Sequence, residues 1–293
     1  MGVRLTLTAR LLLILILIPQ WGFSWGYTAH RIINRQAVHL LDSLLGEYFS
    51  HHINYLSEHA IDPDLWRRDK EAYPDEAPGH FIDADLYEAY PFRNIPRKWE
   101  EVVRKYGEEN LMSWGTAPWR IEKFYNKLVQ EFKEGRWTEA RLTATALGHY
   151  VSDIHVPFHT VENYNGQLTG NKGVHKRWEA DMVEEYLLDA ARPRGPVEMV
   201  TDPVEKAFVI VEESFPGLDP ILKAETRARQ TIPPESRDII PDWDRPMQGT
   251  EYIRILYEET ADLAISRMEA SSLRVASYWM SAWVKAGSPP PPD

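Results

Sequence analysis

The chain has 293 residues, a formal net charge of −11 and no cysteine. Without cysteine it has no disulfide bond and no thiolate nucleophile or ligand, so a metal site must be built from His, Asp, Glu and backbone groups. The acidic balance argues against a broad nucleic-acid-binding surface, which normally carries a basic stripe, but leaves room for a local cationic site.

The first residues have the pattern of a secretory signal peptide. MGVRLTLTAR carries two arginines and no acid, the apolar run LLLILILI follows, and Gly22 and Ser24 stand at the small-residue positions of a cleavage site. The apolar run is too short to span a bilayer, which disfavours a retained anchor. We expect cleavage of residues 1–24 and export to the periplasm or the extracellular space, leaving Trp25 as the N-terminus and no membrane span. Loss of the two arginines changes the charge from −11 to −13.

The mature chain has the sequence pattern of a helical protein. Five stretches carry apolar residues at the spacing of an α-helix. They are residues 28–49, 119–135, 137–154, 175–195 and 250–287. Alternating strand patterns bounded by turn dipeptides are scarce. We therefore expect one all-α domain over residues 25–286, with irregular segments near residues 70–96, 160–174 and 230–248. The Pro-rich tail at residues 287–293 cannot continue a helix.

The segment GHYVSDIHVPFH ends the third of these stretches. His149 and Asp153 are four residues apart, so they share one face of a helix and could hold one ion. His155 is turned to the opposite side and is interpreted as a core or surface histidine. Pro157 disfavours helical geometry just before it, which places His159 on a redirected chain. The spacing of His149 and Asp153 alone fits a structural hydrogen bond equally well.

A second pair of the same kind follows in GVHKRWEADM, where His175 and Glu179 are also four residues apart. Two such pairs on different helices, with His159 between them, resemble the inward-facing ligand sets of metal sites in helical bundles. Zinc is the metal most compatible with imidazole and carboxylate ligands in the absence of thiolate, and manganese or ferrous iron also fit.

Five motifs together carry a resemblance to a known group of enzymes. WGYTAH, DPDLWR, GHFID, HYVSDIHVPFH and HKRWE resemble the zinc-dependent phospholipase C and single-strand nuclease superfamily. The matching order is a Trp at the mature N-terminus, a His five residues later, an Asp, a His, then His-x3-Asp-x5-His and His-x3-Asp/Glu. The residues at these positions are Trp25, His30, Asp64, His80, His149, Asp153, His159, His175 and Glu179.

The resemblance implies an all-α fold of the phospholipase C/nuclease type, with three zinc ions in a cleft. The implied ligand sets are Asp64, His80, His149 and Asp153 for one ion; the α-amino and carbonyl groups of Trp25 with His30 and Asp153 for the second; and His159, His175 and Glu179 for the third. Asp153 would therefore bridge two ions.

Some residues near the motifs match no ligand position. DLWR matches the Asp-x-x-Arg of the family, which selects Asp64 rather than Asp62. Asp62 can instead stand at the start of a helix ahead of Pro63. The histidines that match no ligand position are expected to be structural or solvated: His39, His51, His52, His59 and His155.

The chemistry follows from the charge of such a cluster. Three zinc ions would carry six positive charges, of which the carboxylates of Asp64, Asp153 and Glu179 offset three. The remaining positive charge would bind a phosphate anion even on an acidic protein, because the ions dominate the local electric field. Metal ions lower the pKa of bound water and can stabilise the leaving oxygen. By resemblance, Asp64 orients or deprotonates the attacking water. We expect a secreted zinc-dependent hydrolase of phosphoric esters.

The sequence favours a phospholipid slightly over nucleic acid as substrate. Glu179 is similar to the phospholipase branch, since the nuclease branch usually has Asp there, and the lack of cysteine departs from disulfide-bearing nucleases. On the other side, residues 169–171 (TGN) partly resemble the Gly-Gly-Asn of the nuclease branch, with Thr169 at the first glycine. The alternatives are a single-strand nuclease or 3′-nucleotidase and, in a different class, an inactive zinc-binding module.

The substrate is expected to contact the loop YNGQLTGNKG, unless this is a plain glycine-rich connector. Tyr164 could stack on a base or line a lipid headgroup site, as could Phe158 and Trp178, although such aromatic residues usually belong to the core. Arg67 could contact a phosphate or pair with a surface acid. Asn171 completes the candidate contacts. The expected partner is a phospholipid headgroup, single-stranded nucleic acid or a nucleotide, and no protein partner is predicted.

Overall fold

The structure, a computed structural model, describes residues 26–233 and 249–292. Every regular element in these ranges is a helix, which confirms the predicted all-α class. No helix in these ranges combines the length and the apolar composition needed to cross a membrane. The expected signal peptide, Trp25 and most of the expected irregular segment at 230–248 lie outside the described residues.

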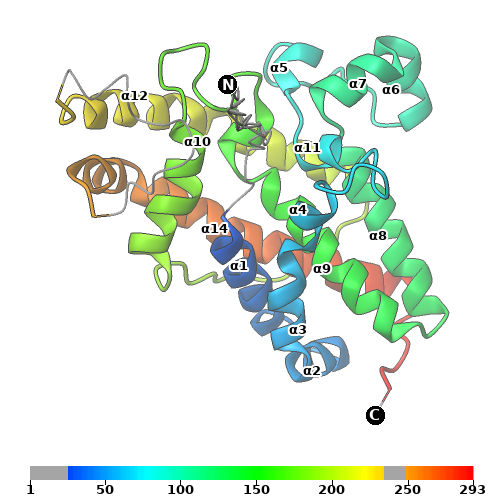
Figure 1. Cartoon of the computed structure of the whole chain (residues 1–293). Helices are drawn as coiled ribbons and strands as arrows, with labels where there is room; N and C mark the ends of the chain where they lie inside the picture. The colour runs from blue at the N-terminus through cyan, green and yellow to red at the C-terminus, as the bar shows by residue number, and fades with distance from the viewer. Residues whose placement is uncertain (1–25, 234–248, 293) are drawn as a thin grey trace, which may run out of the picture.

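The helix α14 (Glu251–Lys285) is the element on which the larger helices pack. It contacts α1 (Tyr27–His39), α8 (Ala117–Lys133), α9 (Trp137–Asp153) and α12 (Leu218–Arg229). Figure 1 shows it crossing the molecule behind α1. With 35 residues it is about 50 Å long, and so it spans the domain. Three of the expected helical stretches correspond closely to α8, α9 and α14.

Shorter helices complete the fold and connect the larger ones. They are α2 (Leu44–His51), α3 (Ile53–Glu58), α4 (Asp62–Trp66), α5 (Ala84–Tyr87), α6 (Trp99–Tyr106), α7 (Glu108–Trp114), α10 (Val174–Lys176) and α11 (Pro203–Ser214), with the single turns η1 (His59–Ile61), η2 (Ala77–His80), η3 (Pro157–Thr160) and η6 (Phe215–Gly217). The segments η4 (Arg177–Asp181) and η5 (Val183–Leu187) are π-helical. The stretch expected to form one α-helix from residue 175 is therefore largely π-helical, a geometry that is frequent at functional sites.

The stretch at residues 28–49 has one continuous apolar pattern, but the structure divides it into α1 and α2. Ser43 begins α2, where its hydroxyl oxygen accepts a hydrogen bond from the backbone N–H of Gly46 at 3.3 Å. The turn is tight, because a Cβ at Gly46 would lie 2.1 Å from the carbonyl oxygen of Leu41. Apolar periodicity does not predict this break, because leucines occur on both sides of it.

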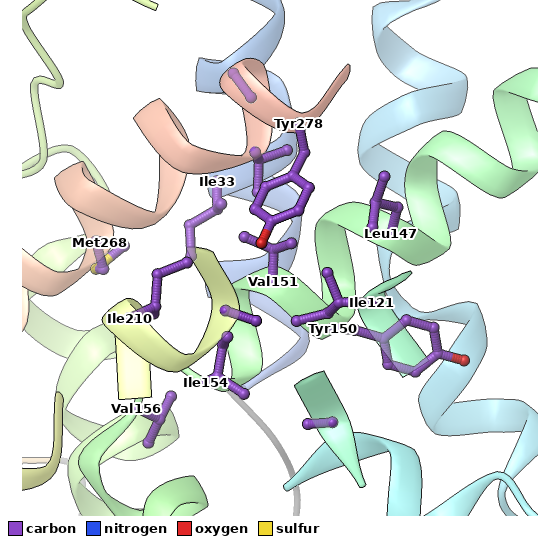
Figure 2. Close-up of a cluster of buried hydrophobic side chains, with 14 of the residues drawn as sticks. Ile33, Ile121, Leu147, Tyr150, Val151, Ile154, Val156, Ile210, Met268 and Tyr278 are labelled. Atoms are coloured by element: carbon purple, nitrogen blue, oxygen red, sulfur yellow. The ribbon is translucent and has the colours of Figure 1, made fainter. Parts of the chain in front are cut away.

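The core around the middle of the molecule lies where α1, α9 and α14 meet. Ile33 of α1, Val151 of α9 and Tyr278 of α14 are fully buried and lie together in Figure 2. The indole N–H of Trp279 donates to the carbonyl oxygen of Ala144 at 2.8 Å, so its polar atom is satisfied inside the core. This packing holds the C-terminal end of α9 in place, and that end carries two of the predicted ligands.

The helices α1 and α9 approach each other closely at Gly148. A Cβ at this position would lie 2.3 Å from Oδ1 of Asn34. Asn34 is buried, and its amide nitrogen donates to the carbonyl oxygens of Leu56 at 3.1 Å and Thr145 at 3.4 Å. Because these bonds hold Asn34 in place, the glycine sets the separation of two helices that both carry predicted ligands.

We therefore expect Gly148→Ala to lower the free energy of unfolding by about 1–3 kcal/mol, because the added methyl group must displace Asn34 or the helix. Without this close contact the same change would raise stability by up to about 1 kcal/mol, since Ala is the better helix former. Urea unfolding followed by circular dichroism decides the sign. The control is Glu139→Ala, an exposed position of the same helix, which should change stability by less than about 0.5 kcal/mol.

Candidate metal centre

Of the nine predicted ligand residues, all but Trp25 lie in the described part of the chain, and these are all buried. They form three overlapping or adjacent groups in which the possible ligand atoms lie within 4.8 Å of one another. The groups are His30, Asp64 and His149; His80, His149 and Asp153; and His159, His175 and Glu179. Residues that are far apart in the sequence thus meet in two places, a combined patch around His149 and a separate triad.

Asp153 occupies the centre of the combined patch. Its Oδ2 lies 3.0 Å from Nδ1 of His80 and 3.3 Å from Nε2 of His149. Its Oδ1 lies 3.3 Å from Nε2 of His30. The two oxygens therefore face different histidines, as a carboxylate that bridges two ions would require. Asp64 completes the patch, and its Oδ1 lies 3.9 Å from Nδ1 of His80 and 4.0 Å from Nε2 of His149.

Three histidines are held by hydrogen bonds at the nitrogen that faces away from the candidate ions. Nδ1 of His149 lies 2.8 Å from the carbonyl oxygen of Ala60, and Nδ1 of His159 lies 2.7 Å from that of His80. Since a carbonyl oxygen only accepts, Nδ1 of these two rings carries a proton, and Nε2 is the nitrogen that faces inward and can bind an ion when it is deprotonated. Nδ1 of His30 similarly contacts the hydroxyl of Ser152 at 2.7 Å. Such outer contacts orient metal-binding imidazoles.

His80 has the opposite orientation, with Nδ1 toward Asp153 and Nε2 3.5 Å from Oε1 of Glu76. Glu76 is buried, accepts a hydrogen bond from the hydroxyl of Tyr150, and lies 3.6 Å from the guanidinium of Arg120. This carboxylate can fix the ring of His80 in the way that outer carboxylates fix metal-binding histidines. We did not predict a role for Glu76, and its position four residues before His80 was the only available signal.

The third group consists of His159 on the turn η3, His175 on α10 and Glu179 on the π-helical segment η4. Oε2 of Glu179 lies 2.9 Å from Nε2 of His175 and 3.8 Å from Nε2 of His159. Among the described residues, neither oxygen of Glu179 has a hydrogen-bond partner, and neither has Nε2 of either histidine. Burial raises the pKa of Glu179 to about 8 and lowers the pKa of His175 to about 3. A divalent cation would supply positive charge to these buried carboxylate oxygens and bind the imidazole lone pairs beside them.

The charges of the combined patch are balanced differently. Burial alone would lower the pKa of His149, but the carboxylates of Asp153 and Asp64 outweigh burial and raise it to about 9. Burial would likewise raise the pKa of Asp153, yet His149 and its neighbours hold it well below its usual range. Burial lowers the pKa of His30 to about 4. The buried carboxylates thus require a cation, and a metal ion competes for His149 with its proton.

Other residues near the motifs lie outside the three groups. Oδ2 of Asp62 pairs with Nδ1 of His59 at 2.8 Å, so Asp62 is engaged at the start of α4, while Asp64 points into the patch. Phe158 and Trp178 are fully buried and belong to the core. This leaves them no exposed face on which a base or a lipid headgroup could stack.

The three candidate substrate contacts have different surroundings. Nη2 of Arg67 lies 3.1 Å from Oδ1 of Asp64, so its guanidinium stands at the edge of the patch. Tyr164 is 46% exposed on the loop that follows η3. Asn171 is buried, and its amide nitrogen donates to α12, at 3.2 Å to the carbonyl oxygen of Leu222. The amide nitrogen of Asn171 thus holds its loop against α12. The roles of Arg67, Tyr164 and Asn171 in substrate binding stay predictions.

Comparison with known protein families identifies a family that matches most of this chain. Residues 24–200 match the S1/P1 Nuclease family, a region that contains all nine predicted ligand positions. The match confirms the resemblance to the phospholipase C/nuclease superfamily and implies a phosphodiester hydrolase that acts on nucleic acid. The slight preference for phospholipase C, drawn from Glu179 and Thr169, is not supported, and the nuclease alternative is closer. Comparison with curated proteins gave no match.

The central position of Asp153 leads to a test of the combined patch. Asp153→Asn keeps the shape of the side chain but removes the charge that faces both candidate ions. We expect this variant to lose bound zinc and to lower phosphodiester hydrolysis more than about 100-fold. Elemental analysis and initial rates measure the two effects.

His155→Gln is the matched control, because His155 is also buried but directs Nδ1 to the carbonyl oxygen of Val151 at 2.8 Å. The control should retain its zinc. Normal zinc content in Asp153→Asn, or zinc loss in His155→Gln, would contradict the assignment.

Proposed function

The chain belongs to the S1/P1 nuclease family, and we propose that it is a zinc-dependent nuclease that hydrolyses phosphodiester bonds of single-stranded nucleic acid. The observation that carries this proposal is the meeting of buried imidazole and carboxylate groups from distant segments of the chain, with the possible ligand atoms of each group within 4.8 Å of one another. A 3′-nucleotidase activity at the same centre is the second candidate, because the donor set does not distinguish a diester from a monoester.

The donor set suits zinc, since it combines imidazole and carboxylate groups without thiolate. We propose three ions, held by the ligand sets that the family resemblance implies. Bound zinc would supply a water of lowered pKa and positive charge for the phosphate and the leaving oxygen. The protein holds the ligands in place through Ala60, Ser152 and the backbone of His80, so little reorganisation is needed on binding.

Asp64 is the residue that we assign to the attacking water. Burial would raise the pKa of its carboxyl group, but Arg67 and the histidines of the patch hold the pKa below its usual value. Asp64 therefore stays ionised and acts as an acceptor that can orient a water molecule or take its proton. Arg67, 3.1 Å from Asp64, is placed to support the phosphate at the edge of the patch.

Tyr164 is the residue that we assign to a base of the substrate. It is exposed on the loop between η3 and α10, and both of these flanking elements carry ligands of the third group. An exposed aromatic ring on a loop between two such elements offers a stacking surface that accepts any base. This supports a single-stranded substrate, because bases in a duplex are already stacked on each other.

The substrate class is tested with the zinc-loaded protein and a panel of single-stranded DNA, RNA, 3′-nucleotides and phosphatidylcholine vesicles. We expect turnover of single-stranded nucleic acid to exceed release of phosphocholine by at least about tenfold, to stop with a chelator and to return with zinc. Double-stranded DNA of the same length is the control for strand selectivity. Release of phosphocholine without cleavage of nucleic acid would contradict the proposal, and bound zinc without any turnover would support an inactive module.

The role of Trp25 has its own test, since cleavage after Ser24 is a proposal too. An amine donates to a metal only when it is free and deprotonated, and an amide nitrogen is a poor donor. A protein that keeps two residues before Trp25 should therefore bind one zinc ion fewer and hydrolyse single strands more slowly. Removal of the extension should restore both. The control carries the same two residues after Asp293, and full activity of the N-terminally extended form would remove Trp25 from the centre.

A further inference from the structure

The exposed face of α1 carries a row of basic residues that begins at Arg31, directly after His30 of the metal centre. His30 points into the combined patch, and the adjacent Arg31 is exposed. Arg35 and His39 follow at intervals of four residues and are exposed as well. Successive members are one helical turn apart, so the row runs about 12 Å along the helix. The helix itself contains no acidic residue.

The row continues into a shallow cavity of about 370 Å³ at the C-terminal end of α1. Its polar lining includes His39, Gln36, Arg192 and Arg194. The amide of Gln36 is already engaged, with Nε2 donating to the carbonyl oxygen of Ala191 at 2.9 Å. The charged side chains in this lining are the guanidinium groups of Arg192 and Arg194. We call Arg31, Arg35, His39, Arg192 and Arg194 the cationic band.

The arginines of the band differ from most others in the described part of the chain. Most of the other described arginines pair with acids, as Arg97 does with Glu205 at 2.7 Å. Within the described residues no band arginine forms an ion pair with a carboxylate side chain. Arg35 donates to the neutral Oδ1 of Asn54 at 2.9 Å. One carboxylate, Glu269, lies close, where it accepts a hydrogen bond from the backbone N–H of Arg192 at 2.7 Å.

We propose that the cationic band binds the phosphodiester backbone of a single-stranded substrate beyond the nucleotides held at the metal centre. The inference rests on the proposed nuclease function. A chain with a net charge of −11 repels a long polyanion, so productive binding needs a local path of positive charge. The band supplies such a path, it begins at the residue after His30, and its arginines are not neutralised by acids among the described residues.

Nucleic acid fits the band better than an anionic membrane surface does. Peripheral membrane binding normally adds apolar or aromatic side chains that enter the lipid interface. Among the described residues, none of the exposed large hydrophobic side chains lies on α1 or in the segment 191–195. A narrow row of cations that leads away from a phosphodiesterase centre instead suits a linear chain of phosphates.

The band is tested by two double variants, Arg31→Gln with Arg35→Gln and Arg192→Gln with Arg194→Gln. Binding of a phosphorothioate single strand of about 20 nucleotides to the zinc-loaded protein is measured at several salt concentrations. Because log K falls as log salt rises, each removed phosphate contact should make this slope less steep by about 0.7. Each double variant should therefore reduce the steepness by about 1.4. KM for the long strand should rise at least about tenfold, with kcat and the KM for a dinucleotide unchanged.

The matched control is Arg104→Gln with Lys133→Gln, which removes the same charge from exposed positions of α6 and α8. If the band variants equal this control in slope and in KM, the inference is wrong. If they bind strands normally but lose retention on phosphatidylserine vesicles, the band is a membrane surface and the inference is also wrong. Because binding is measured without turnover, a wild-type protein that cleaves no nucleic acid contradicts the proposed function and not the band.

Discussion

The burial of three carboxylates, Asp64, Asp153 and Glu179, is the constraint on which the rest of the centre depends. A buried carboxylate is costly unless positive charge or hydrogen bonds offset it. Around Asp153 the offset comes from three histidines, whereas Glu179 has a pKa raised to about 8 because burial dominates there. Helices α1, α4 and α9 and the turn η2 are packed so that their polar side chains meet where divalent cations can replace protons.

The same constraint explains how an acidic protein can act on a polyanion. The net charge determines the electrostatic potential far from the molecule. At the centre, the charges nearest to a bound phosphate dominate the potential. In the proposed function, the ions and Arg67 would make the centre locally positive, and the arginines of α1 would extend that potential along the helix. Many other arginines of the described residues pair with acids, as Arg274 does with Glu198 at 2.9 Å.

Much of the centre could be predicted because its residues follow short-range rules. Residues four apart on a helix share a face, so His149 with Asp153 and His175 with Glu179 were recognisable as pairs. The second pair remains close although π-helical geometry begins between its members, and Nε2 of His175 lies 2.9 Å from Oε2 of Glu179. Glu76 was missed, because its role depends on the contact with Tyr150 and Arg120, and no sequence spacing encodes that contact.

The sequence by itself determined the all-α class, the three longest helices, the family and the chemical type of the ligands, because periodicity and motif order are local properties. The tertiary structure decided which oxygen of Asp153 faces which histidine, which imidazole nitrogen points inward, and where the apolar stretch at residues 28–49 breaks. It also decided that Gln36 and His39 of α1 line one cavity together with Arg192 and Arg194. These features depend on how distant segments pack, and burial and electrostatics between them are set only when the chain folds.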